Sequence, residues 1–157
     1  MEEIVDRLFA RALKYISYRD RSEKEVVDYL NKKLRKSDDL ELVDKVVEKL
    51  KGHNLIDDLE FAGKWVGARF RSGRGPVRIG MELVKKGIER SVIKSSLMEI
   101  DDSGWIKSAK ELIGKRKKRW EKEEYLKKRE KAMRFLVYRR FPLGMARKVI
   151  DQTLKRE

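Results

Sequence analysis

Hydrophobic residues recur along this chain at the three- and four-residue spacing of amphipathic helices. In the first such segment, Ile4, Leu8 and Ala12 share one face. The pattern continues almost to the end of the chain and is interrupted only by short polar or glycine-containing stretches. The helices it predicts cover about residues 3–18, 23–34, 40–52, 58–69, 76–86, 92–100, 103–120, 123–139 and 143–156.

The residues between these segments are typical helix start and stop signals. Ser22 and Glu25 have the spacing of a capping box, and Pro76 fits the first position of a helix. Three aspartate pairs, at 38–39, 57–58 and 101–102, each precede a predicted helix. Paired carboxylates can serve acid–base or metal chemistry, but at these positions we expect them to cap helix N-termini.

A spacing of 53 residues relates several apolar and basic positions of the predicted helices. The triplets that share it are Val26, Ile79 and Ala132; Leu30, Leu83 and Leu136; and Lys33, Lys86 and Arg139. Such an internal period is typical of a repeat architecture. We therefore predict an all-α fold of three tandem three-helix repeats, elongated and curved, with domains at 1–53, 54–102 and 103–157.

The net charge of +14 is concentrated in the last third of the chain. Residues 1–60 carry −2, residues 61–106 carry +4 and residues 107–157 carry +12. A field of this sign attracts nucleic acid, an anionic membrane or an acidic protein surface. The chain has no cysteine, no apolar run of the roughly 18 residues that a membrane span needs, and an acidic start. We expect a cytoplasmic protein without disulfides.

The loop RSGRGP at 71–76 has the glycine content of a phosphate-binding loop. It follows a predicted helix and not a strand, and it lacks the Lys-Ser/Thr end of a P-loop. We therefore interpret it as an interhelical turn in which two glycines relax the backbone. Arg71, Arg74 and Arg78 are nevertheless candidates for contact with phosphate or carboxylate near a helix N-terminus.

The stretch KRKKRWEKEEYLKKREK at 115–131 is the strongest electrostatic feature of the sequence. It is either a solvated helical face or an anion-binding surface, and its charge density favours the second. Trp120 and Tyr125 could stack on bases, although aromatics at helical spacing more often lie in a core. The candidate anion-binding residues are Lys115, Arg116, Lys117, Lys118, Arg119, Lys127, Lys128 and Arg129.

The sequence contains no constellation of catalytic residues. His53 is the only histidine and is expected in a turn, so no Ser-His, Cys-His or multi-histidine site can be built. We predict no enzymatic activity, no metal site and no cofactor.

Several of these residues resemble the RecX family, bacterial regulators of the recombinase RecA. IDD-x-x-FA at 56–62, Trp65, Arg69, G-x-x-RI at 75–79, EL at 82–83 and KGI at 86–88 are similar to the second RecX repeat. R-S-x-x-E at 21–25 with Leu30 is similar to the first, and FL-x-x-R-x-F at 135–141 to the third. Two departures stand out: Arg140 replaces the usual glycine of repeat three, and Leu34-Arg35 replaces a Gly-aromatic pair in repeat one.

The resemblance implies a helical modulator that lies in the groove of the RecA–DNA filament and inhibits RecA ATPase, strand exchange and co-protease activity. It implies roles in DNA repair, recombination and the SOS response, with RecA as the partner and with DNA contacted through RecA and the basic C-terminal third. From the residue pattern itself we expect no membrane association and a monomer, since no coiled-coil seam is present. A protein that binds single- or double-stranded nucleic acid on its own is the alternative.

Overall fold

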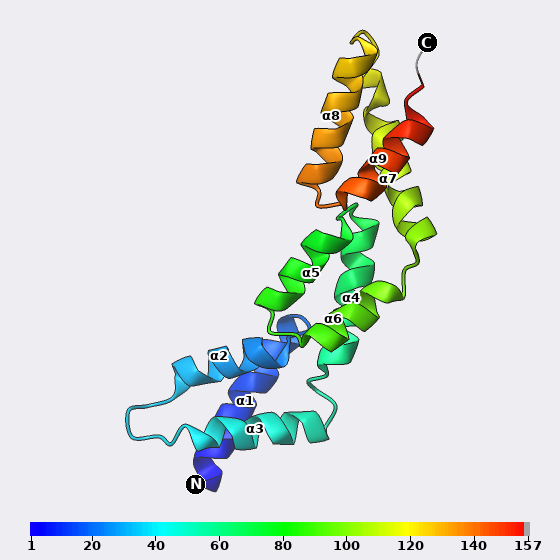
Figure 1. Cartoon of the computed structure of the whole chain (residues 1–157). Helices are drawn as coiled ribbons and strands as arrows, with labels where there is room; N and C mark the ends of the chain where they lie inside the picture. Colours follow the sequence, from blue (N-terminus) through cyan, green and yellow to red (C-terminus); the bar gives the residue numbers. More distant parts are fainter. Residues whose placement is uncertain (156–157) are drawn as a thin grey trace.

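The computed structural model describes residues 1–155, which form helices and no strands (Figure 1). A short 3-10 helix, Lys117–Trp120, follows α7. The α-helices are α1 (Glu2–Tyr18), α2 (Glu23–Lys33), α3 (Glu41–Gly52), α4 (Asp58–Arg71), α5 (Pro76–Lys85), α6 (Arg90–Met98), α7 (Asp102–Arg116), α8 (Tyr125–Tyr138) and α9 (Leu143–Thr153). The all-α prediction is confirmed.

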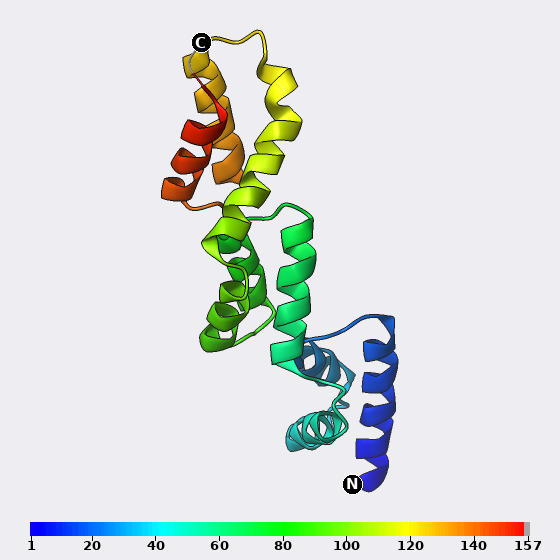
Figure 2. The ribbon, with the colours of Figure 1, turned by 90° about the vertical axis from the view of Figure 1, so that its right-hand side faces the viewer.

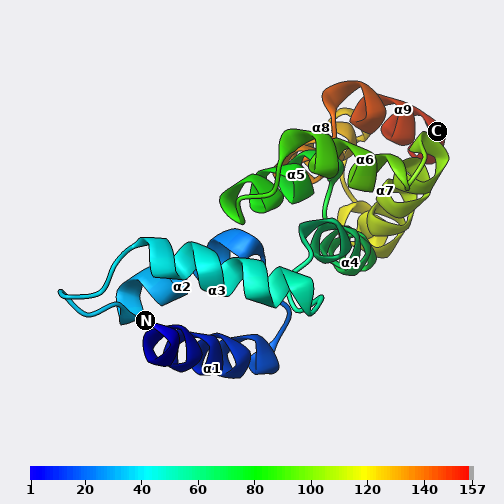
Figure 3. The same ribbon diagram turned by 90° about the horizontal axis from the view of Figure 1, so that it is seen from below.

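The helices pack in sequential groups of three, α1–α3, α4–α6 and α7–α9. Figures 1 and 2 show these triplets following one another along an elongated molecule, with the N-terminus at one end and α8 and α9 at the other. Seen from below, the first triplet lies to one side of the other two (Figure 3), so the axis changes direction between triplets. The predicted elongated repeat fold is confirmed, while the domain limits at 53 and 102 stay a prediction.

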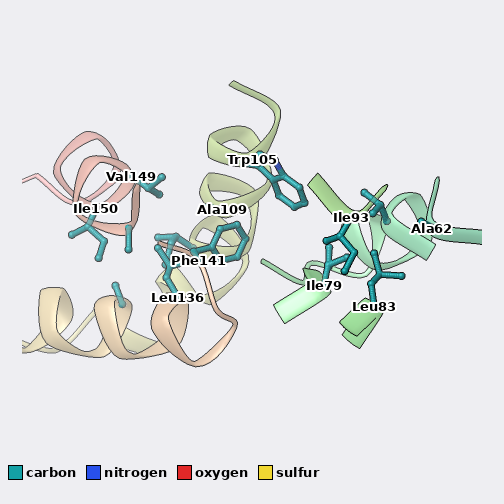
Figure 4. Packing of buried hydrophobic residues seen from close by; sticks show 14 of the residues in the cluster. Ala62, Ile79, Leu83, Ile93, Trp105, Ala109, Leu136, Phe141, Val149 and Ile150 are labelled. Atoms are coloured by element: carbon teal, nitrogen blue, oxygen red, sulfur yellow. The ribbon is translucent and has the colours of Figure 1, made fainter. Parts of the chain in front are cut away.

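Two apolar clusters hold the molecule together. One belongs to the first triplet and also takes in Ile56, while the other runs through the second and third triplets. Figure 4 shows Trp105 between the cores of these two triplets. Its ring packs edge-on against Phe70 at a centroid distance of 5.2 Å. The residues related by the 53-residue spacing, Val26, Ile79 and Ala132 with Leu30, Leu83 and Leu136, are all fully buried.

Helix capping follows the sequence signals at three of the four expected positions. Ser22 and Glu25 form the capping box, Asp57 accepts from the amide of Glu60, and Asp101 accepts from the amide of Gly104. The prediction for the pair before α3 is confirmed only in part, because the N-cap is Leu40 and Asp39 accepts from the amide of Glu41, the first residue of α3. Asp38 instead accepts from the Arg35 amide and from Arg7, which closes the preceding turn.

The boundaries predicted for the third triplet need correction. The helix expected over 103–120 ends as an α-helix at Arg116, and the helix expected from 123 begins at Tyr125. The 3-10 turn between them buries Trp120, which is 8% exposed and packs edge-on to Phe135. The 3-10 turn thus coincides with the burial of this ring against α8. The last helix ends at Thr153, and its predicted end at 156 lies outside the described residues.

Four helices end in the same left-handed turn. The residues with positive φ are Asn54, Gly73, Gly87 and Arg140, and in each case the next amide bonds back to a carbonyl five residues earlier. This is the Schellman motif, in which glycine is preferred because it has no Cβ. Arg140, with φ of 64°, therefore adopts the same left-handed turn as Gly87.

We expect Arg140→Gly to raise the free energy of unfolding by about 1 kcal/mol, because glycine relieves the left-handed strain. Urea unfolding of the wild type and the variant measures the change. Arg140→Ala is the control, since it removes the same side chain but keeps the strain. Equal stability of the glycine and alanine variants would show that the backbone is not strained at this turn.

Candidate functional site

The RSGRGP segment is an interhelical turn, as interpreted from sequence: Arg71 ends α4, Arg74 lies in the turn and Arg78 lies in the first turn of α5. Gly73 has φ of 78°, and Gly75 is the N-cap of α5. Gly75, however, does not relax the backbone, because its φ of −76° suits any residue. A Cβ at Gly75 would lie 2.5 Å from the backbone of Arg140, so glycine is needed here for close approach to the end of α8.

The three candidate arginines near this turn lie on two different surfaces. Arg71 lies with Lys115 of α7 around an open groove of about 420 Å³. Arg74 and Arg78 lie at the end of α8 instead. Burial and the charges of Arg74, Arg116 and Arg78 lower the pKa of Arg139 there. Arg74 Nε is buried and has no hydrogen-bond partner among the described residues.

The basic run at 115–131 spans α7, the 3-10 helix and α8, so its charged side chains do not lie on one helix face. Lys117, Lys118 and Lys128 line an open cavity of about 770 Å³ beside Trp120 and Tyr125. Burial of Trp120 makes the base-stacking interpretation wrong for this residue and the core interpretation right. Tyr125 is half-buried and packs against the same apolar cluster.

The other basic residues of the run have separate surroundings. Arg116 lies over the ring of Phe135 at 4.5 Å, and Arg129 pairs with Asp151. Arg119 and Lys127 are exposed. Seven of the eleven candidate residues therefore fall into three groups and the other four lie apart from them, so the candidates do not form one site, and their role in binding stays a prediction.

The contact between the first and second triplets is built from the N-terminus of α2 and the C-terminus of α5. The buried hydroxyl of Ser22 donates to the carbonyl oxygen of Lys86 at 2.7 Å. The Glu23 amide donates to the Asp58 carboxylate at 2.9 Å, and burial raises the pKa of Asp58. We refer to this contact as the first junction.

Glu25 is the charged centre of the first junction. Its carboxylate lies 2.6 Å from an Arg19 nitrogen and 2.5 Å from Lys86 Nζ, and it accepts from the Ser22 amide. Burial alone would raise its pKa, but these hydrogen bonds and charges outweigh burial and lower the pKa of Glu25 to about 2. One carboxylate thus joins two cations across the two triplets.

The second junction repeats this geometry 53 residues further along the chain. At this contact between the second and third triplets, the Gly75 amide donates to the Arg139 carbonyl at 2.9 Å, where the Ser22 hydroxyl donates to the Lys86 carbonyl at the first junction. The residue equivalent to Glu25 is Arg78, so the bridging carboxylate is replaced by a cation. Sequence reasoning missed Arg139 and Arg140 as parts of this basic cluster. The signal was present, because the 53-residue spacing already aligned Arg139 with Lys86.

The described residues contain no group of three or more potential ligand side chains able to hold a metal ion. None of the helices in the described part of the chain has the length and apolar character required to cross a membrane. His53 ends α3 beside Phe9, as expected for a turn residue.

These features define a class: a helical-repeat protein whose candidate functional surfaces are basic and open. Two family profiles match the chain, "RecX, first three-helix domain" over residues 9–50 and "RecX, second three-helix domain" over 57–97. Together they cover more than half of its length. The chain belongs to the RecX family.

Curated relatives agree with this assignment. The chain is 35% identical to the regulatory protein RecX of Geobacillus sp. over 98% of its own length and 54% of the relative's. It is 31% identical to that of Oceanobacillus iheyensis, covering 96% of the chain and 55% of the relative. The chain thus spans about half the length of these relatives. They are named as regulatory proteins and not as enzymes, in agreement with the prediction of no enzymatic activity.

Solved structures share the fold. The crystal structure of RecX from Lactobacillus salivarius superposes with a TM-score of 0.89 at 24% identity, covering 98% of both chains. A second crystal structure, of a regulatory protein RecX, gives a TM-score of 0.80 at 26% identity and covers 94% of this chain and 71% of the other.

Proposed function

We propose that this protein regulates RecA by binding along the RecA–DNA filament, where it inhibits ATP hydrolysis, strand exchange and co-protease activity. Membership of the RecX family is the observation that carries the proposal. An elongated stack of triplets provides a long contact surface suited to a polymer. Under this proposal the protein acts in the cytoplasm by occupying the filament groove and performs no chemistry of its own.

The distribution of charge supports a DNA contact through the third triplet. Residues 107–157 carry a net charge of +12, and Lys117, Lys118 and Arg119 are exposed on the 3-10 turn. Cations placed against phosphates release counterions, which makes the affinity depend on salt.

The first test is an ATPase titration at a fixed amount of single-stranded DNA. A filament regulator inhibits RecA at concentrations well below those that coat the DNA.

The same charge distribution favours one alternative, a protein that binds nucleic acid independently of RecA. That alternative requires similar affinity for bare DNA and for filaments, and inhibition only near DNA saturation.

We expect charge reversal of Lys115, Lys117, Lys118 and Arg119 to weaken filament binding and to reduce the slope of log affinity against log salt by about 3, since each phosphate contact contributes about 0.7 on single strands. Arg116 is left unchanged because it stacks on Phe135. Fluorescence anisotropy with labelled filaments at several salt concentrations measures both effects.

The matched control reverses four exposed basic residues of the first triplet, Arg11, Lys14, Lys32 and Lys36. This variant has the same net charge as the test variant but leaves the third triplet intact. Equal weakening by both variants would show that total charge matters and that the 115–119 segment has no special role.

A further inference from the structure

An open groove of about 560 Å³ lies between α5 and α8 at the second junction. Its lining residues are Arg78, Met81, Glu82, Lys85, Arg134, Val137, Tyr138 and Arg140. Only Arg78 among them was a candidate from sequence. The groove lies near the point where the end of α8 meets the start of α5. Figure 1 shows these two helix ends meeting between the second and third triplets.

The groove has more positive than negative charge. Its only carboxylate, Glu82, already pairs with Arg69 at 3.0 Å and with Arg78 at 3.4 Å, and it accepts from the indole of Trp65. Within residues 1–155, Lys85 and Arg140 lie within ion-pair distance of no acidic group. The groove can therefore accept further carboxylates or phosphates.

The first junction shows which charges are missing from this groove. Its equivalent groove is lined by Glu25 and Asp28 of α2, which face Lys86 and Lys24. At the positions 53 residues later, α5 has Arg78 for Glu25 and Met81 for Asp28. The lining of the groove at the first junction has three carboxylates against four cations, whereas the lining at the second junction has one carboxylate against four cations.

An exposed apolar stripe runs along α5 beside these cations. Val77, Met81 and Val84 are 48%, 50% and 59% exposed and occupy positions i, i+4 and i+7, which share one helix face. Tyr138 on α8 is 76% exposed at the groove edge. A phosphate backbone has no apolar surface to cover an aliphatic stripe, whereas an amphipathic protein segment has carboxylates and apolar side chains together.

We propose that the α5–α8 groove docks an acidic amphipathic segment of a partner protein. Carboxylates of that segment pair with Arg78, Lys85 and Arg140, and its apolar side chains cover Met81 and the stripe beside it. This inference rests on the proposed function. In that setting the groove contacts the RecA protein of the filament, while the basic third triplet contacts the DNA of the filament.

A peptide titration tests the groove independently of RecA. The probe is a fluorescent 20-residue peptide with glutamate and leucine on opposite helical faces. Met81→Asp, which introduces the acid that α2 has at this position, should weaken its binding at least tenfold, as should Arg78→Ala. Leu59→Asp on α4, another exposed apolar position, is the control and should change binding less than twofold. Failure of the wild type to bind the peptide overturns the docking site.

Three further probes separate the possible partners. A peptide with serine in place of leucine should bind at least tenfold more weakly, and equal binding would overturn the role of the apolar stripe. With DNA-free RecA as probe, Met81→Asp should lose at least tenfold in affinity, while its binding to a single-stranded oligonucleotide changes less than twofold. An equal loss for the oligonucleotide overturns the proposal in favour of a nucleic-acid surface. Binding of the peptide without binding of RecA supports the docking site and refutes RecA as its partner.

Discussion

Gly75→Ala is expected to lower the free energy of unfolding by about 3 kcal/mol, the upper range for a group forced into packed surroundings. A Cβ at this position lies 2.5 Å from the carbonyl carbon and oxygen of Arg140 and 2.6 Å from the Arg139 carbonyl oxygen. These are backbone atoms, so no side-chain rotation relieves the clash. Separation of α5 from α8 would also break the hydrogen bond from the Gly75 amide. Urea unfolding followed by circular dichroism measures the loss.

Gly114→Ala is the matched control for this variant. Gly114 lies within α7, and a Cβ there meets no atom within 4 Å. Alanine has the higher helix propensity, so this variant should be up to about 1 kcal/mol more stable than the wild type. A Gly75→Ala protein as stable as the wild type would show that the second junction is not closely packed.

Glu25→Gln is expected to destabilise the protein by about 2 kcal/mol at pH 7, the scale of hydrogen bonds to a charged group. The substitution keeps the shape of the side chain but removes the charge that joins Arg19 to Lys86, and it leaves both cations of the first junction without a carboxylate. Unfolding in urea at neutral pH measures the difference. Glu48→Gln, at a side chain that is 75% exposed, is the control and should cost less than about 0.5 kcal/mol.

The same carboxylate makes the first junction sensitive to acid. The pKa of Glu25 is about 2 in the folded protein and about 4.5 for an unperturbed glutamate. Because the folded value is the lower one, its contribution to stability is complete above about pH 5 and disappears as the pH falls toward 2. The difference between wild type and Glu25→Gln should therefore shrink between pH 5 and pH 2. A constant difference over this range would show that the Glu25 charge does not stabilise the folded state.

Most of the fold follows from local features of the sequence. Amphipathic spacing located each helix, and the signals at Ser22, Asp57 and Asp101 marked helix starts because side-chain capping is a local interaction. The end of α7 could not be predicted in this way. Its conversion to a 3-10 turn depends on the contact of Trp120 with α8, which joins residues from different elements.

The candidate surfaces were only partly predictable. Arg78 was identified from its position just after the glycine loop, but Lys85 and Arg140 became part of a groove only once the end of α8 was placed against α5. The position of Arg140 also depends on a left-handed turn that sequence preference assigns to glycine. Periodicity identified which positions are equivalent, whereas the charge difference between the two junctions required knowledge of which helix ends meet.

The linear order of the triplets has a mechanical consequence. The first and third triplets lie at opposite ends of the molecule, so each is joined to the rest through α4–α6 (Figure 1). Because the far end of the molecule is distant from each junction, a rotation of a few degrees at either junction displaces that end. One apolar cluster runs through the second and third triplets, so a partner that contacts both ends would concentrate bending at the polar first junction, whose stiffness would then determine how well the protein follows the pitch of what it binds.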